Sequence, residues 1–501
     1  MRETVVHGSQ WTYASAAELA QALGASKVSA VELARDAIER IESADAALNA
    51  ICVKTYESAL AQAADADARL ARGERGPLLG VPMTIKESFN LTGAPTTWGF
   101  PEAREYRPTE DALIVSRVKA AGAVVLGKTN VPVGLDDGQS YNAIYGVTNN
   151  PYDPQRTPGG SSGGSAAALA AGFGPLSLGS DIGGSLRVPA HFCGIFAHKP
   201  TLNLVPGRGQ TPPFLPALPY SDDLAVVGPM ARAADDLFAL LEAIAGPDEL
   251  VDGVGYRLAL PPPRAMKLAE ARVLVLARHP LGPTDESVAA AIEALAAELE
   301  KAGASVSRAS PLLPDLDAAT RLYMRMVAAI SCAFMPQEAF LRIAAFAHVL
   351  DPADSSLAAE RLRGATRSFR GWIADAARRG GVRASWRAFY REFDALICPI
   401  SPTAAFPHDH EPDHERRRLI VNGAEQPYVD LLLLWPGVAT LPGLPATTVP
   451  VGRTPEGLPI GVQIVGPWLE DRTTLELARL IEQEFGGFVP PPAFAGTGGE
   501  A

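Results

Sequence analysis

The chain has 501 residues, 47% of them hydrophobic, and a formal net charge of −12. Its length allows several small domains or one large one, no apolar run reaches the length of a membrane span, and the first residues lack a secretory signal. The acidic balance, without any basic block, argues against binding to nucleic acid, which needs clustered lysine and arginine. We therefore expect a cytoplasmic globular protein with no nucleic-acid or membrane partner.

In the first half of the chain, short apolar segments alternate with segments of helical periodicity. Two S-x-x-E capping boxes, Ser15 with Glu18 and Ser29 with Glu32, predict the starts of two helices. Further helices are predicted by periodicity at residues 56–71, 111–121, 165–171 and 234–244. Short apolar strands are predicted at residues 81–85, 123–126 and 176–178.

The second half opens on a linker rich in proline and glycine at residues 247–270 and then repeats the alternation. Strands are predicted at residues 272–277, 305–307, 395–399, 446–451 and 459–465. Helices are predicted at residues 285–302 and 473–485, with others up to about residue 390. This pattern predicts an α/β fold with a mixed, twisted central sheet covered by helices on both faces. We expect one domain over residues 1–501, with a core at about 15–485 and a more variable helical subregion at about 250–395.

The most unusual stretch of the sequence is glycine-rich and covers residues 157–189. It contains two serines flanked by glycines, Ser161 and Ser185. Glycine weakens helices and strands but suits tight turns and close approach of the backbone to a ligand. Free N–H groups beside a serine hydroxyl suit a site that stabilises a developing negative charge. The stretch therefore suggests a nucleophilic serine, which would need an adjacent base.

A nucleophile-elbow motif and five histidines are weak candidates for a catalytic or metal-binding site. Residues 160–164 match the nucleophile elbow G-x-S-x-G, but the proline-containing segment before them cannot form the required central strand. His191 and His198 lie near Ser185 in sequence, and either could be a base or a structural hydrogen-bonding residue. The histidines His408, His410 and His414 could bind a metal, but the acidic residues around them favour a solvated loop at residues 407–418.

The four cysteines also give no sign of a metal site. They are far apart, fit no zinc spacing and are expected to be reduced thiols. They are Cys52, Cys193, Cys332 and Cys398.

Lys86 is a stronger candidate for the base. It ends an apolar strand, so its amine is expected to be partly removed from water, which lowers the pKa of a lysine from about 10.4. A lysine that is neutral near pH 7 can accept a proton from serine. The alternative for a lysine at a strand end is a surface position that extends its charge into solvent.

Three segments together resemble the amidase signature family. They read GVPMTIKES with Lys86, GGSSGGS with Ser161 and Ser162, and SDIGGSLRVP with Ser185. The spacings, 75 (161 − 86) and 24 (185 − 161), are those of the family. The flanking segments that agree are LGKTNVP, TNNPYD, FCGIFAHKPT and GLPIGVQIVGP, so the resemblance covers about residues 15–485.

The resemblance implies a Ser–cis-Ser–Lys triad. Ser185 would be the nucleophile, Ser161 would relay the proton, and Lys86 would be the base. An oxyanion hole would be formed by the backbone N–H groups of Ile182, Gly183, Gly184 and Ser185. The residues implied as supports of this centre are Ser162, Asp181 and Arg187. No metal or organic cofactor is implied, and the family suggests a homodimer.

The first functional hypothesis is a stand-alone hydrolase of small, fairly apolar amides, with esters or carbamates as further substrates. Apolar segments at residues 213–220, 322–334 and 431–435 could line its pocket or belong to the core, and loops at residues 211–222 and 311–350 are expected to set its specificity. One alternative is the glutamine-hydrolysing A subunit of a tRNA-dependent amidotransferase, which needs a partner surface. Another is a non-catalytic binding protein, which the intact Lys86, Ser161 and Ser185 disfavour.

Overall fold

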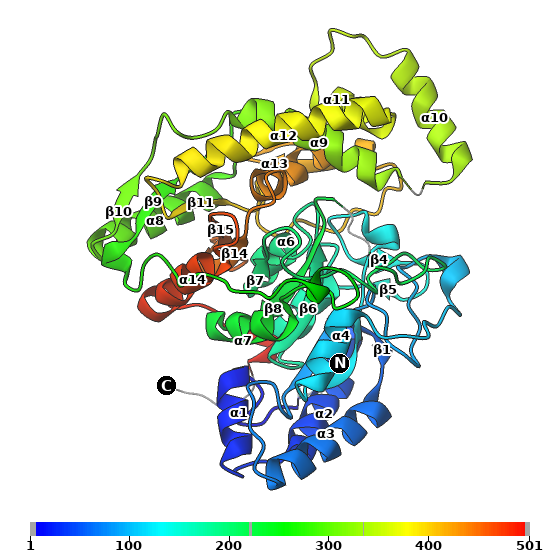
Figure 1. Ribbon diagram of the computed structural model, residues 1–501, viewed down its shortest axis with the longest axis vertical. Coiled ribbons are helices and arrows are strands. Elements are labelled where there is room, and N and C mark those ends of the chain that lie inside the picture. Colours follow the sequence, from blue (N-terminus) through cyan, green and yellow to red (C-terminus); the bar gives the residue numbers. More distant parts are fainter. Residues whose placement is uncertain (1–6, 220–222, 334, 496–501) are drawn as a thin grey trace.

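A computed structural model describes residues 7–219, 223–333 and 335–495. Its centre is a mixed sheet of eleven strands, which confirms the predicted fold class (Figure 1). From one edge to the other, the strands are Ile51–Lys54 (β1), Val124–Thr129 (β3), Pro82–Lys86 (β2), Leu176–Asp181 (β6), Val226–Ala231 (β8), Phe196–Lys199 (β7), Ala446–Arg453 (β14), Pro459–Val465 (β15), Ala395–Pro399 (β11), Arg272–Val275 (β9) and Ser305–Ser307 (β10).

Strand directions divide this sheet into regions. Strands β3, β2 and β6 run parallel to one another, as do β11, β9 and β10 at the other side. The strands between these two groups pair antiparallel, and β1 is an antiparallel edge strand. Strands β9 and β10 thus bring part of the subregion at 250–395 onto the edge of the same sheet.

Helices cover the sheet and extend beyond it. Those packed around the sheet are Ala16–Gly24 (α1), Ala30–Leu48 (α2), Tyr56–Ala71 (α3), Leu113–Ala120 (α4), Gly163–Ala170 (α5), Arg187–Cys193 (α6), Ala234–Ile244 (α7), Glu286–Lys301 (α8) and Asp471–Phe485 (α14). A second group gathers at the end of the molecule opposite α1–α3 (Figure 1): Leu316–Ser331 (α9), Gln337–His348 (α10), Leu357–Ala365 (α11), Phe369–Phe389 (α12) and Tyr428–Thr440 (α13). Among the described residues, no helix is long and apolar enough to cross a membrane.

Local sequence signals account for many of these elements. The capping boxes are present, because Ser15 and Ser29 each accept the backbone N–H of the glutamate three residues later, at 3.1 Å. Three strands of the central sheet were not predicted: β1, β7 and β8. Strand β7 carries the polar residues His198 and Lys199, and β8 contains a glycine and a proline, so neither shows a clear apolar run.

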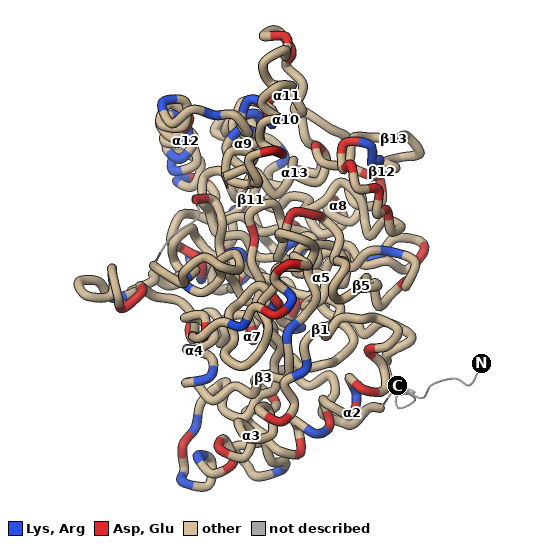
Figure 2. The backbone as a smooth tube through the Cα atoms, turned by 90° about the vertical axis from the view of Figure 1, so that its right-hand side faces the viewer, with Lys and Arg blue, Asp and Glu red and all other residues tan. Residues whose placement is uncertain are grey.

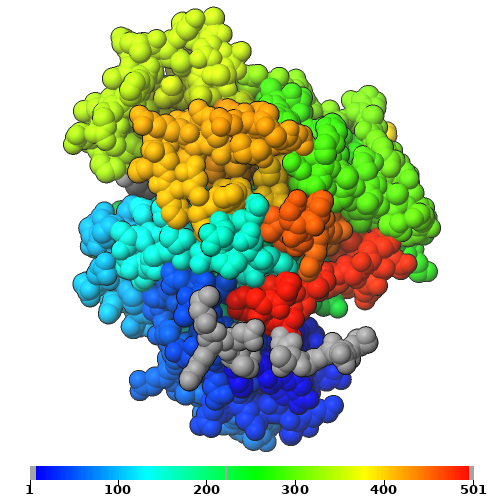
Figure 3. Space-filling model, turned by 180° about the vertical axis from the view of Figure 1, so that it is seen from behind, coloured from blue at the N-terminus to red at the C-terminus, as the bar shows by residue number. Residues whose placement is uncertain are grey.

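Three further elements, two strands and a helix in the C-terminal part of the chain, were not predicted either. The hairpin of Arg418–Val421 (β12) and Ala424–Pro427 (β13) follows the predicted polar loop, and α13 contains Pro436 in its interior. Figure 3 shows this segment, in orange, against the N-terminal half in cyan. Gln139 and Asp409 join the two by hydrogen bonds of 2.5 and 3.0 Å. A second short hairpin, Tyr141–Asn142 (β4) with Gly146–Val147 (β5), lies nearby.

The parallel strands position the candidate site. Strands β2, β3 and β6 are buried along their whole length, and their carboxyl ends lie side by side at Lys86, Thr129 and Asp181. In α/β sheets, ligands bind beyond the carboxyl ends of parallel strands. In Figure 2, positions of basic and of acidic residues alternate along the backbone over much of the chain.

Candidate active site

Lys86 and Ser161 are in direct contact. Lys86 is the last residue of β2 and is fully buried. Its Nζ atom lies 2.7 Å from Ser161 Oγ and 2.9 Å from Ser180 Oγ. Burial lowers the pKa of Lys86 to about 7, although the negative charge of Asp181 acts in the opposite direction. The amine can therefore be neutral near physiological pH and accept a proton.

Ser161 lies in the glycine-rich loop that leads into α5. The peptide bond between Gly160 and Ser161 is cis. A side chain at Gly160 would collide with backbone atoms of Asp137 and Gln139, which explains why the smallest residue stands there. The preceding segment forms no strand in the sheet, which confirms the rejection of a nucleophile elbow at residues 160–164.

Ser185 lies in the tight loop between β6 and α6. The Ser162 N–H donates to the Ser185 carbonyl oxygen at 3.2 Å, which ties this loop to the loop of Ser161. Asp181 accepts the N–H groups of Gly184 at 3.0 Å and Leu186 at 3.1 Å. The Gly184 N–H is thus engaged by a carboxylate and is not free to bind an oxyanion, while the roles of Ile182, Gly183 and Ser185 in the expected oxyanion hole stay predictions.

Arg187 anchors this loop to the rest of the fold. It is fully buried and forms an ion pair with Asp181 at 2.8 Å. Its guanidinium also donates to Gln463 Oε1 at 2.7 Å and to Thr440 Oγ1 at 2.9 Å. Burial alone would raise the pKa of the Asp181 carboxyl, but Arg187 and the surrounding hydrogen bonds lower it to about 2. The contacts of Ser162, Asp181 and Arg187 are those of supporting residues, and any part in catalysis stays a prediction.

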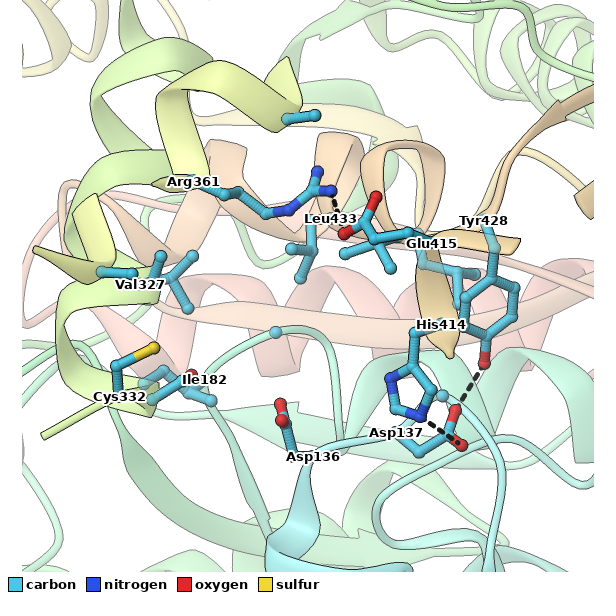
Figure 4. A pocket seen from close by; sticks show the side chains of 18 of the residues that line it. Asp136, Asp137, Ile182, Val327, Cys332, Arg361, His414, Glu415, Tyr428 and Leu433 are labelled. Carbon is cyan, nitrogen blue, oxygen red and sulfur yellow. Dashed lines mark hydrogen bonds and ion pairs between the residues drawn. The ribbon is translucent and has the colours of Figure 1, made fainter. Parts of the chain in front are cut away.

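A cavity of about 650 Å³ opens in front of these loops (Figure 4). Ser185, Ile182, Gly183 and Gly160 form part of its wall. Two of the apolar segments that could line a pocket or belong to the core contribute to its wall, 322–334 through Val327 and Ala328 and 431–435 through Leu432 and Leu433. The wall is therefore mostly apolar near the candidate nucleophile.

The third segment does not line the cavity. The described residues of 213–220 and of the loop 211–222 are absent from its wall, so for them the pocket-lining alternative has no support in this cavity, and the role of the loop in specificity stays a prediction. Tyr220 and Phe334, which belonged to the expected lining, lie outside the described residues. By contrast, Ile343 and Phe346 of α10 do line the cavity, as expected for the loop region at 311–350.

The histidines near Ser185 in sequence have structural partners. His191 accepts the Gly461 N–H at Nδ1 (2.7 Å) and contacts the Thr403 carbonyl oxygen through Nε2 (3.0 Å), and burial lowers its pKa to about 4. His198 contacts Thr447 and Asp471. These contacts support the structural interpretation of both residues.

Two of the histidines in the predicted polar loop, His410 and His414, contact residues of the N-terminal half. His410 stacks on Tyr141, and His414 lies 3.6 Å from Asp137. Among the residues that the structure describes, no group of three histidine, cysteine, aspartate or glutamate side chains could hold a metal. All four cysteines are free thiols.

Sequence reasoning missed several side chains of this region. Ser180 touches Lys86, and it lies inside the SDIGGS segment that carries Ser185, so that segment held the signal. The polar wall of the cavity was also missed. It comprises Asp136, Asp137, Arg361, Asp413, His414 and Glu415. No local pattern links these residues, which come from three distant segments.

Comparisons with known proteins cover nearly the whole chain. The family model described as Amidase matches residues 32–475. The A subunit of the glutamyl-tRNA(Gln) amidotransferase of Picosynechococcus sp. is 32% identical over 93% of this chain and 96% of its own length. Indoleacetamide hydrolase of Bradyrhizobium diazoefficiens is 32% identical over 96% of this chain and 88% of its own.

A solved structure extends the likeness to the fold. A bacterial aryl acylamidase of the amidase signature family superposes with a TM-score of 0.80 over 98% of this chain and 99% of its own, at 24% identity. The family model matches most of the chain, and the curated relatives are about one third identical to it over nearly its whole length. This chain belongs to the amidase signature family and is an amide-hydrolysing enzyme.

Proposed function

We propose that this protein is a stand-alone amidase that cleaves small, fairly apolar amides through Lys86, Ser161 and Ser185. The observation that carries the proposal is the buried contact of 2.7 Å between Lys86 Nζ and Ser161 Oγ, beside a cavity whose wall includes Ser185. Serine is a weak nucleophile without a base. A buried lysine whose pKa is lowered to about 7 supplies one.

In the proposed mechanism, Ser185 Oγ attacks the acyl carbon of the amide. Its proton passes to Ser161, whose own proton passes to neutral Lys86. The oxyanion accepts hydrogen bonds from the N–H groups of Ile182, Gly183 and Ser185, and one such donor contributes about 3–4 kcal/mol to the barrier reduction. Protonated Lys86 returns a proton through Ser161 to the leaving amine. Water then hydrolyses the ester of Ser185 by the same route.

The cavity wall supports the substrate class. Apolar side chains of α9, α10 and α13 surround the space next to Ser185. An aryl or alkyl group would bury its apolar surface there, with about 25 cal/mol gained for each Å² removed from water. Esters and carbamates of the same shape present the same acyl carbon and are further expected substrates.

The test replaces Ser185 by alanine. Turnover of an aryl amide should fall to background, and a fluorophosphonate probe should label the wild-type protein but not Ser185→Ala. Ser58→Ala makes the same chemical change at an exposed position of α3 and serves as the matched control, with turnover and labelling retained. Hydrolysis of the anilide by Ser185→Ala would end the proposal, and a wild-type chain that resists the probe would favour a binding protein.

The A subunit of an amidotransferase is the second candidate, favoured by the 32% identity to a chain of that name. In that case the same centre would release ammonia from glutamine for a partner chain. The mostly apolar wall of the cavity favours the first candidate. The ratio of kcat/KM for glutamine to that for aryl amides separates the two, and a purified chain active on glutamine alone would support the second. The expected homodimer stays a prediction.

A further inference from the structure

The cavity wall contains four carboxylates, and three of them have a basic partner. Asp137 pairs with Arg417 at 2.7 Å, Asp413 with Arg416 at 3.2 Å, and Glu415 with Arg361 at 2.5 Å. The fourth is Asp136. Its side chain forms neither an ion pair nor a hydrogen bond with any residue of the described ranges.

Asp136 points into the cavity that contains Ser185. In Figure 4 its carboxylate points into the cavity. Ile182 and Cys332 lie on one side of it, and His414 lies on the other. Asp136 is exposed to the solvent that enters the cavity. The protein atoms around its carboxyl group still raise the pKa of Asp136 to about 6, with Asp137 acting in the same direction and His414 against it. The group is therefore ionised at neutral pH but poorly compensated.

We infer that Asp136 is a specificity-determining residue that binds a positively charged amine carried by the substrate at a distance from the scissile amide. This inference rests on the proposed function, in which the cavity receives the substrate. It narrows the substrate class from apolar amides to amides with an apolar body and one ammonium group.

The charged groups of the cavity wall determine whether a cationic or an anionic ligand is favoured. The carboxylate of Asp137 is already satisfied by Arg417 and by the Tyr428 hydroxyl at 2.6 Å. Arg361 faces Glu415 and Asp430 and has no surplus charge to offer an anion. A carboxylate without a basic partner in a mostly apolar wall attracts a cation. When a neutral group occupies the same space, the carboxylate stays unpaired and the complex is less stable. A ligand with an ammonium group should therefore bind more tightly than its neutral isostere.

The experiment compares pairs of 4-nitroanilides that differ only in charge. One member carries a terminal ammonium on an acyl chain of three to five methylenes, and the other ends in a methyl group of similar size. A second series carries the ammonium on the leaving aniline. In one of the two series, the wild-type enzyme should have a kcat/KM that is roughly tenfold to a hundredfold higher for the charged member. This ratio corresponds to the free energy of one hydrogen bond to a charged group. Asp136→Asn should reduce that preference to about one.

The matched control is Asp65→Asn, which makes the same charge change at an exposed position of α3 and should leave the preference unchanged. A wild-type enzyme without preference in either series, or a preference that survives Asp136→Asn, overturns the inference. Because a misfolded variant would lose both substrates together, only a change in their ratio counts in its favour.

The pH dependence gives a second readout. As the pH falls below about 6, Asp136 becomes protonated and the preference for the charged substrate should disappear. The other titratable or charged groups that line the cavity are Asp137, Cys332, Arg361, Asp413, His414, Glu415 and Tyr428. They remain in Asp136→Asn, so a pH-dependent preference in that variant would assign the effect to them and contradict the inference.

A binding measurement separates this inference from the proposed reaction. Titration calorimetry on Ser185→Ala uses 4-phenylbutylammonium and 4-phenylbutanol, and it does not require turnover. Tighter binding of the ammonium that is lost in the Asp136→Asn, Ser185→Ala double variant supports Asp136 even if no amide is cleaved. Equal binding of the two ligands, together with intact amidase activity, removes the inference and leaves the proposed function standing.

Discussion

At the scale of single residues, the environment of Lys86 decides what the site can do. A lysine in water is charged at neutral pH and cannot accept a proton. In this fold the amine is buried and faces two hydroxyl groups, Ser161 and Ser180, at 2.7 and 2.9 Å. Burial disfavours the ammonium form, so the same side chain becomes a base near pH 7.

The pH profile of hydrolysis should report this change. We expect kcat/KM for a neutral aryl amide to rise with pH through a value near 7 and then level off, because only deprotonated Lys86 accepts a proton. Lys86→Ala should lower kcat by on the order of a thousandfold. Repeating the profile in Asp136→Asn excludes the carboxyl that titrates near pH 6. A flat profile between pH 5.5 and 8.5 would contradict the role of Lys86 as base.

Ser180 should affect the same profile through Lys86. Its oxygen accepts a hydrogen bond from the amine and favours the charged form, so Ser180→Ala should move the acid limb to lower pH by about one unit. We also expect kcat to fall roughly tenfold, because the amine loses one of its two positioning contacts. If kcat falls while the acid limb stays in place, Ser180 has only a structural role.

At the scale of elements, the site depends on two loops that only glycine-rich sequence can form. The loop after β6 turns so tightly that Gly184 has a φ of +98°. Its carbonyl and N–H groups are then fixed by Val188 and Asp181. The short turn between a buried strand and α6 places Ser185 at the cavity wall.

Replacing Gly184 by alanine should disrupt this turn. The new Cβ would lie 2.7 Å from Pro436 Cγ and 2.9 Å from Val188 Cγ2, at a φ that alanine adopts only with strain. We expect a loss of about 2–4 kcal/mol in the free energy of unfolding and loss of activity, measured by denaturant unfolding and anilide hydrolysis. Gly73→Ala is the control: its φ is +88° but no atom lies within 4 Å, so it should cost about 1–2 kcal/mol and keep activity.

At the scale of the whole molecule, the cavity joins segments that are far apart in the chain. Asp137 follows β3, whereas Tyr428 begins α13, and their side chains meet at 2.6 Å. Arg417 joins the same group through Asp137 and through the Tyr141 hydroxyl at 2.8 Å. This network fixes the outer helical group against the sheet, and the space between them becomes the cavity.

Tyr428→Phe should loosen that wall without affecting the proton relay. We expect a loss of about 1.5–3 kcal/mol in the free energy of unfolding, because one hydrogen bond to a carboxylate is removed. KM for an aryl amide should change several-fold while kcat stays nearly constant. Tyr141→Phe removes a hydroxyl from the same network away from the cavity wall and should leave KM unchanged. Equal effects of the two variants on KM would contradict the role of Tyr428 in the wall.

The sequence by itself determined the local features of this protein. Capping boxes at Ser15 and Ser29, buried apolar strands such as β2 and β6, and the glycine-rich loops each depend on neighbouring residues, so their patterns can be read in the chain. The spacing of three motifs also pointed to the family. Strands such as β7 and β8 were missed because tertiary burial, not an apolar pattern, keeps them in the sheet.

Only the tertiary structure decided which groups meet. It brought Ser180 to Lys86, engaged the Gly184 N–H with Asp181, and gave Asp136 in the cavity wall no ion pair or hydrogen bond with the described part of the chain. These outcomes depend on distances between atoms of residues that are distant in sequence or on competition for one hydrogen-bond donor. Neither quantity has a local signature, because burial and pairing are properties of the packed molecule.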